Sequence, residues 1–248
     1  MEFRGRDEGP SMQSAQRTAR IAGLFFIGTF VFSIPALLLY SPALKNHHDY
    51  ILGSGFDTRI SVGAFLEVLL AICNIATAVV IYPIVKRVNQ AVSLGYVASR
   101  TVESTIIVMG LISLMSVVTL RHDLAGTGVD PDSLKLVGRS LVAIHYWTFL
   151  LGPQFCAGFG NGLLLGYLMY KSQLVPPRMA LVGLIGGPLA FFGGVLVLFG
   201  VFDDPSSGLF VMTIPEIVWE AFIAIYWTFV GFRRSSPLLA GDGRVAVG

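Results

Sequence analysis

Apolar residues gather along the chain in six long runs, separated by short polar segments. A run of about 20 apolar residues is long enough to cross the hydrocarbon core of a bilayer as an α-helix. The period-two alternation of a membrane barrel is missing, and helices satisfy their own backbone hydrogen bonds in lipid. The pattern therefore predicts an all-α membrane protein, a bundle of six transmembrane helices at Ile21–Tyr40, Ile60–Val85, Leu94–Leu120, Leu141–Tyr170, Met179–Phe202 and Ile214–Phe232.

Composition agrees with a membrane protein. Hydrophobic residues make up 54% of the 248 residues and charged residues 13%, and the mean hydropathy is +0.73. The first run follows Arg17 and Arg20, as a secretory signal would, but it is longer than a signal's apolar core and no small-residue cleavage site follows it. We therefore expect the first run to be a true span.

The chain is expected to form one domain. Residues 17–234 hold the six spans, while residues 1–16 and 235–248 are polar or glycine-rich and are predicted to be a disordered extension and a flexible cytoplasmic tail. Two longer loops, Asn46–Arg59 and Arg121–Lys135, are expected to form a partial cap over the outer face.

Basic residues predict the orientation. Eleven of them flank the spans on the side of the two termini, and five lie in the opposite loops. Because positively charged loops stay in the cytoplasm, both termini are predicted to be cytoplasmic, and the protein is predicted to be a multi-pass protein of the cell's inner membrane. The net charge of +2 is explained by this topology, and nothing in the sequence indicates a nucleic-acid surface.

A small set of polar side chains lies inside the predicted spans. A charge at this depth costs about 2.5–3.5 kcal/mol on insertion scales, so it is usually paired and often functional. Arg100 and Glu103 are three apart and Glu216 and Glu220 four apart, so each pair shares a helix face. The candidate substrate- or ion-binding residues are Glu67, Asn74, Arg100, Glu103, His145, Gln154, Asn161, Glu216 and Glu220.

Two further expectations concern these side chains. His145 and Gln154 are nine apart, about half a turn out of phase, so they share a face only if Pro153 bends the helix. Four carboxylates accompany a single permanent cation, Arg100. Since burial and like-charge neighbours both favour the neutral acid, we expect at least one carboxylate, Glu216 or Glu220 first, to be protonated at neutral pH.

Small residues predict helix packing. Gly158, Gly162 and Gly166 recur every four residues in the fourth span, and Gly183 and Gly187 do so in the fifth. Such spacing lets helix backbones approach closely in lipid, so we expect spans four and five to pack against each other.

Three interpretations of the buried polar residues stay open. The first is a proton-coupled carrier or permeation protein for a small molecule, in which Glu220 or Glu67 holds the exchangeable proton. The second is an intramembrane enzyme acting on a lipid or apolar substrate, with Glu103 or His145 as acid or base. The third is a non-catalytic partner or sensor subunit in which the polar residues only lock the helices together.

No metal site or cofactor is predicted. His47, His48, His122 and Asp123 fit no zinc spacing, and only His145 lies at membrane depth. The partners that the sequence indicates are the lipid bilayer and a small molecule or proton. Oligomeric state is not encoded in any pattern that we find.

One stretch is specific enough to suggest a family. The segment Leu94–Glu103, with Gly-Tyr-x-x-x-Arg-x-x-Glu at its centre, resembles a bacterial integral-membrane family known as domain of unknown function 4386. The resemblance extends from about Arg17 to Arg233 through Glu67 with Asn74, Tyr82-Pro83, Leu151-Gly-Pro153, Leu174 to Pro176, Gly183 to Pro188, and Pro215-Glu216 with Trp219-Glu220. It implies a bacterial inner-membrane protein of six or seven helices and no particular activity.

Overall fold

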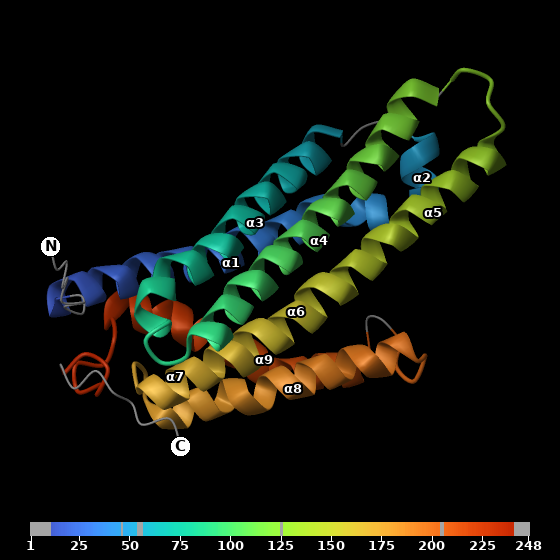
Figure 1. The fold of residues 1–248 in the computed structure, drawn as a ribbon. Helices are drawn as coiled ribbons and strands as arrows, with labels where there is room; N and C mark the ends of the chain where they lie inside the picture. The colour runs from blue at the N-terminus through green and yellow to red at the C-terminus, as the bar shows by residue number, and fades with distance from the viewer. Residues whose placement is uncertain (1–10, 46, 54–56, 125, 204–205, 241–248) are drawn as a thin grey trace, which may run out of the picture.

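The computed structural model describes residues 11–45, 47–53, 57–124, 126–203 and 206–240, and within them the regular structure is entirely helical. The chain forms a long, splayed bundle (Figure 1). Its elements are α1 Met12–Lys45, α2 His47–Leu52, α3 Asp57–Val85, α4 Gln90–Leu124, α5 Pro131–Phe149, η1 Leu150–Gln154, α6 Phe155–Ala157, η2 Gly158–Leu165, α7 Gly166–Ser172, α8 Pro177–Leu198 and α9 Ser207–Phe229.

Five of these helices are individually long and apolar enough to cross a membrane: α1, α3, α4, α8 and α9. They coincide with five of the six predicted spans, which confirms the prediction of an all-helical membrane protein. The fourth predicted span differs, because it falls on five consecutive helical pieces, α5 to α7, rather than on one α-helix.

The pieces from Pro131 to Ser172 follow one another without a break. The residues at their junctions, Leu150, Phe155, Gly158 and Gly166, all keep right-handed helical dihedral angles. Two of the pieces, η1 and η2, are π-helical. π turns hold one more residue than α turns and occur mostly at functional sites, so this helix changes its winding where the predicted polar residues lie.

Local chemistry sets where the helices begin and end. Asp130 caps α5 by accepting a hydrogen bond from the Ser133 amide at 2.9 Å, and the hydrogen bonds from Ser133 hold the pKa of Asp130 below its usual value. Ser206 caps α9 in the same way. Gln173 ends α7 in the left-handed region at φ 55°, and Pro177 then starts α8 at a position where no amide hydrogen is needed.

The spans close into a ring in which α1 packs against α3, α3 against α4, α4 against η2, η2 against α8, α8 against α9, and α9 against α1. One end of this ring is filled by an apolar core. Its fully buried members include Phe26 from α1, Ile81 from α3, Tyr96 from α4 and Trp219 and Trp227 from α9. This core closes the end at which the described chain begins and ends.

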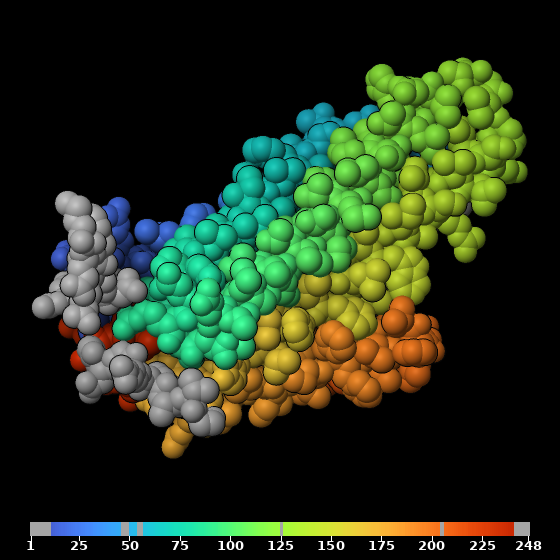
Figure 2. All heavy atoms as spheres, viewed as in Figure 1, coloured from blue at the N-terminus to red at the C-terminus, as the bar shows by residue number. Residues whose placement is uncertain are grey.

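The opposite end is built differently. A second apolar core there, which includes Tyr40, Ile60, Leu114 and Val142, joins α1, α2, α3, α4 and α5 and contains no residue of α8 or α9. The pair α8 and α9 diverges from α4 and α5 toward this end (Figure 1). Figure 2 shows the same separation as a notch between the two arms on one face. The bundle is therefore tight at one end and splayed at the other.

Both described chain ends lie at the tight end. The Gln16 side-chain amide donates to the Phe232 carbonyl at 2.7 Å, the Arg233 amide donates to the Leu174 carbonyl at 2.8 Å, and Leu238 is 1% exposed. Helix α1 thus begins inside the extension predicted as residues 1–16, and residues 235–240 of the predicted tail pack against the bundle. Residues 1–10 and 241–248 lie outside the described residues.

Helix α2 covers the splayed end of α1, α4 and α5, where the loops were predicted to form a cap. Ile51 is fully buried there, and Arg121 pairs with Asp57. The Tyr50 hydroxyl donates to Asp57 at 2.6 Å, and burial raises the pKa of Tyr50 to about 12, so this phenol stays a donor. The side chains of His47 and His48 lie outside the described residues.

The predicted glycine contact between the fourth and fifth spans is confirmed. A Cβ atom on Gly158 would lie 2.7 Å from the Gly187 carbonyl oxygen, and one on Gly166 would lie 3.1 Å from the Leu184 amide nitrogen. At Gly158 the backbones leave no space for a side chain, so the contact of η2 with α8 depends on glycine there. At Gly166, the first residue of α7, a side chain would require Leu184 to shift slightly.

Candidate functional site

A cavity of about 670 Å³ lies between the middle of the bundle and its splayed end. Its wall is formed mainly by α1, α3, α4, α5, η1 and α9, with single residues from α6, η2 and α8, and it is lined by eight of the nine predicted polar residues. The ninth, Asn161, bonds to one of these eight from η2. Helices that are far apart in sequence therefore bring their polar side chains to one buried place, as the sequence predicts.

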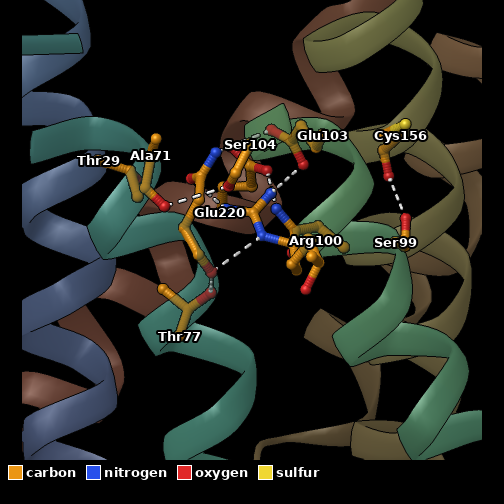
Figure 3. A network of polar contacts seen from close by, with 12 residues as sticks. Thr29, Ala71, Thr77, Ser99, Arg100, Glu103, Ser104, Cys156 and Glu220 are labelled. Atoms are coloured by element: carbon orange, nitrogen blue, oxygen red, sulfur yellow. Dashed lines mark hydrogen bonds and ion pairs between the residues drawn. The ribbon is translucent and has the colours of Figure 1, made fainter. Parts of the chain in front are cut away.

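Arg100 lies at the centre of the largest polar network (Figure 3). Its guanidinium donates to Glu103 at 2.6 Å and to the Asn74 side-chain oxygen at 2.5 Å. The Asn74 amide in turn donates to the second oxygen of Glu103 at 3.2 Å. The three side chains are 2–4% exposed and form a closed triangle that joins α3 to α4. The predicted pair Arg100 and Glu103 thus has a third member on another helix.

Backbone atoms support this triangle from both sides. Thr77 donates to the Asn74 carbonyl at 2.6 Å, and Ser104 donates to the Ala71 carbonyl at 3.1 Å (Figure 3). Ser99 donates across to the Cys156 carbonyl of α6 at 3.1 Å. These hydrogen bonds hold α4 against α3 on one face and against α6 on the other, so Arg100 has a fixed position in the wall.

Glu67 forms a second group nearer the splayed end. The Tyr40 hydroxyl donates to Glu67 at 2.6 Å, and the Tyr40 ring lies edge-on to the His145 ring at 5.4 Å between centroids. All three residues line the cavity. The Nδ1 atom of His145 is buried and has no hydrogen-bond partner among the described residues.

Glu220 and Asn161 form a third group at the boundary with the tight end. The Asn161 side-chain amide donates to Glu220, and the indole of Trp219 donates to the Asn161 carbonyl at 2.9 Å. A backbone carbonyl oxygen has two lone pairs, so it is able to accept a hydrogen bond from outside its own helix. Gln154 makes a comparable link, donating to the Ala190 carbonyl at 2.8 Å and to Thr213 at 3.0 Å.

Glu216 differs from the other three carboxylates. It is 3% exposed and lines the cavity, yet neither of its side-chain oxygens has a hydrogen-bond partner among the described residues. Buried polar groups are nearly always satisfied, so Glu216 stands out as the one of these four carboxylates that no described residue pairs.

His145 and Gln154 were predicted to lie half a turn out of phase unless Pro153 bends the helix. They come to the same cavity because the winding of the helix changes between them. Both residues line the cavity, although an α-helix would place them about half a turn apart. The π-helical piece Leu150–Gln154 lies between them and contains Pro153. The extra residue in a π turn shifts the side chains that follow it around the helix axis, which brings Gln154 to the cavity.

The opening of the cavity is apolar. The lining residues that are also solvent-exposed in the bundle are Ile34 and Leu37 of α1, Phe149 of α5, and Phe210 and Ile217 of α9. These side chains belong to membrane-spanning or span-flanking helices and have no polar neighbours to satisfy. The mouth of the cavity is therefore apolar, while the polar groups lie at the bottom.

Sequence reasoning missed several residues of the wall. Tyr40, Thr148 and Thr213 line the cavity beside the predicted polar set, and Tyr40 is the hydrogen-bond donor to Glu67. Hydroxyl side chains near span ends are common and carry no charge, so no pattern singled them out. The seven-residue spacing between Glu67 and Asn74 marks the face of α3 but does not reveal what faces it.

Taken together, the fold and this buried acidic cavity define a polytopic α-helical membrane protein with a ligand-sized interior site. Within that class, the chain belongs to the family described as Domain of unknown function (DUF4386), which matches residues 21–231. Comparison with curated proteins and with solved structures gave no match.

Proposed function

We propose that the protein is a proton-linked carrier for a small organic molecule. One observation carries this proposal: a cavity of about 670 Å³ between apolar helices of span length is lined by four carboxylates and one guanidinium, and an apolar core fills one end of the bundle. Carriers bind substrate and coupling ion near the bilayer midplane and expose the site to one side at a time. Ionisable groups inside a membrane mark such pathways.

The topology of this proposal has six crossings. The continuous helix from Pro131 to Ser172 is the sixth, because it runs from the splayed end of the bundle to the tight end (Figure 1). An even number of crossings agrees with the meeting of Gln16 and Phe232 at one end. The tight end also carries the larger share of the basic residues, so it would face the cytoplasm of an inner membrane.

The carboxylates have different roles in this mechanism. Glu103 is matched by Arg100 and Asn74, so it supports the wall. Glu220 lies beside Asn161 at the boundary between the cavity and the closing core and forms no direct ion pair with any described residue, so it would carry the exchangeable proton. Glu67, bonded to Tyr40, is the second acid placed to do so.

Proteoliposomes loaded with a pH-sensitive dye test the proposal. A panel of small amines, alcohols and carboxylic acids is presented outside, with and without a pH gradient, and internal pH is followed. We expect at least one compound to drive proton movement in the parent protein and Glu220→Gln to remove the coupling. Asp123→Asn, which deletes an exposed acid outside the cavity, is the matched control and should leave the flux unchanged. No compound-driven flux above protein-free liposomes would reject the carrier.

A second candidate, an intramembrane enzyme, is favoured by the His145 group. His145 Nδ1 has no partner and lies beside the Tyr40 and Glu67 pair, at the end of a cavity whose mouth is apolar. A side chain with these properties is a candidate acid or base. Turnover of bilayer lipid by the purified protein, lost in His145→Gln and kept in Glu220→Gln, would support the enzyme over the carrier.

A further inference from the structure

The unpaired carboxylate of Glu216 indicates what the cavity binds. The other three glutamates each accept a hydrogen bond from a neighbour, Tyr40, Arg100 or Asn161. Glu216 accepts none from the described residues although it is as buried as they are. Leaving a buried carboxyl group unpaired is unfavourable whether it is charged or neutral, so this position is suited to a partner that is not part of the fold.

The position of Glu216 is built by close helix packing. A Cβ atom on Gly162 would lie 2.5 Å from one Glu216 side-chain oxygen, and a Cβ on Gly186 would lie 2.7 Å from the Glu216 amide nitrogen. Two glycines from two other helices therefore make room for this one residue. Gly162 lies against the Glu216 carboxylate and Gly186 against the Glu216 backbone, and the residue lines the cavity.

The unpaired polar atoms of the cavity wall indicate the charge of the ligand. Among the described lining residues, the buried polar atoms without a partner are the two oxygens of Glu216 and Nδ1 of His145. A carboxylate oxygen accepts hydrogen bonds, and an imidazole nitrogen is able to accept one. The single guanidinium of the wall, Arg100, is already bonded to Glu103 and Asn74. The unpaired buried atoms of the described lining are thus acceptors, and its guanidinium already has partners.

The remainder of the wall sets the shape of the ligand. The path from Glu216 to the mouth is bordered by Ile217 and Phe210 on α9 and by Ile34 and Leu37 on α1. A ligand that lies along this path is apolar away from its charged end. No three His, Cys, Asp or Glu side chains of the described residues converge as metal ligands, so the donor set fits an organic cation better than a metal ion.

We propose that the cavity binds a lipophilic primary ammonium ion. The ammonium group donates to both oxygens of Glu216, and its hydrocarbon chain lies between α1 and α9 with its end toward the apolar mouth. The cavity volume lies in the usual range of small-molecule sites, about 300–1,000 Å³. This inference rests on the proposed function only in that the amine would be the cargo; binding itself does not require transport.

Calorimetric titration of the parent protein in lipid nanodiscs tests the ligand class. The probes are n-decylammonium, n-decanol and n-decanoate, which share a chain and differ in the charge and donors of the head group. Titrations of empty nanodiscs are subtracted to remove partitioning into lipid. We expect decylammonium to bind at least about tenfold more tightly than decanol, as a charge-assisted hydrogen bond would give, and decanoate to bind most weakly. Equal affinity for the ammonium and the alcohol would overturn the proposal.

The variant Glu216→Gln tests whether Glu216 is the residue that binds the ammonium group. Glu216→Gln keeps the shape of the side chain and removes its charge, so the preference for ammonium over alcohol should disappear. Asp123→Asn removes an acid of the same charge outside the cavity and should leave the preference intact. A Glu216→Gln protein that retains the full preference would overturn the assignment. If this variant does not fold, the order of the three probes on the parent protein still decides the ligand class.

The binding titrations and the liposome flux experiment together distinguish the ammonium-ligand proposal from the carrier proposal. Selective ammonium binding without proton movement in liposomes would keep the ligand class and reject the carrier. Proton movement driven by another class of compound, without selective ammonium binding, would support the carrier and reject the ammonium ligand.

Discussion

At the scale of single residues, the buried polar groups are of two kinds. Arg100, Glu103 and Asn74 use one another's hydrogen-bonding capacity in a closed triangle. Glu216 keeps both of its oxygens unpaired. A fully satisfied network makes the structure rigid, whereas an unpaired buried polar group is costly and gains from a hydrogen-bond partner outside the fold. The triangle is therefore a support for the cavity, and Glu216 is a group available to a ligand.

Substitutions in the triangle test the supporting role. Arg100→Leu leaves Glu103 and Asn74 buried without their main partner, so we expect a loss of about 3–5 kcal/mol in the free energy of unfolding. Arg100→Leu combined with Glu103→Leu removes both charges and should recover most of that loss, because the uncompensated charge is gone. Reversible unfolding in mixed micelles measures both. A double variant as unstable as the single one would mean that the pair itself is essential.

How far a residue's role is predictable depends on whether its partner lies on the same helix. The pairing of Arg100 with Glu103 follows from a spacing of three and is present. The contacts of Glu67 with Tyr40 and of Asn161 with Glu220 cross between helices. They depend on how each helix is rotated against its neighbour, and that rotation is decided by packing of the whole bundle.

At the scale of elements, the fourth predicted span differs most from expectation, and its change of winding also positions polar groups of the site. Composition predicts one helix over Leu141–Tyr170, and the chain there is helical throughout. The two π-helical pieces were not predicted, because hydropathy reports burial and not winding. The sequence features at these positions are Pro153, which predicts a kink, and the glycines of η2, which predict close helix packing. The extra turn residues place Gln154 on the cavity, and the Asn161 carbonyl of η2 accepts a hydrogen bond from Trp219.

Glycine substitutions test the contact between η2 and α8. In Gly187→Ala the new Cβ would lie 2.6 Å from the Gly162 Cα atom, so the two helices must move apart. We expect a loss of about 1–3 kcal/mol in the free energy of unfolding, the usual cost of overpacking. Gly95→Ala is the control, since its Cβ would meet only Leu164 at an ordinary 3.5 Å. The thermal midpoint of each purified variant measures the effect, and similar losses in both would contradict the packing account.

At the scale of the whole molecule, the ring of helices is asymmetric along its axis. The core around Phe26, Trp219 and Trp227 closes one end, and α8 and α9 diverge from α4 and α5 at the other (Figure 1). Basic residues, predicted from sequence to mark the cytoplasmic side, lie mostly at the closed end. The predicted orientation and the observed cavity together imply that the site communicates with the outer side of the membrane in this conformation.

Labelling of single cysteines tests this orientation. With Cys73 and Cys156 replaced by alanine, Thr127→Cys lies in the exposed loop between α4 and α5, and Lys86→Cys lies at an exposed position between α3 and α4. We expect a membrane-impermeant maleimide to label Thr127→Cys in intact cells and Lys86→Cys only after permeabilisation. The reverse pattern would place the mouth on the cytoplasmic side.

The meeting of the first and last helices has a consequence for biosynthesis. The Phe26 ring packs edge-on against Trp227 at 5.7 Å, and Gly23 lies so close to α9 that a Cβ there would be 2.9 Å from the Trp227 carbonyl carbon. Chains emerge from the ribosome N-terminus first, so the contact between α1 and α9 cannot form until α9 has been translated. Products truncated before α9 would therefore leave this face of α1 uncovered, and we expect cellular proteases to degrade them faster than chains that contain α9.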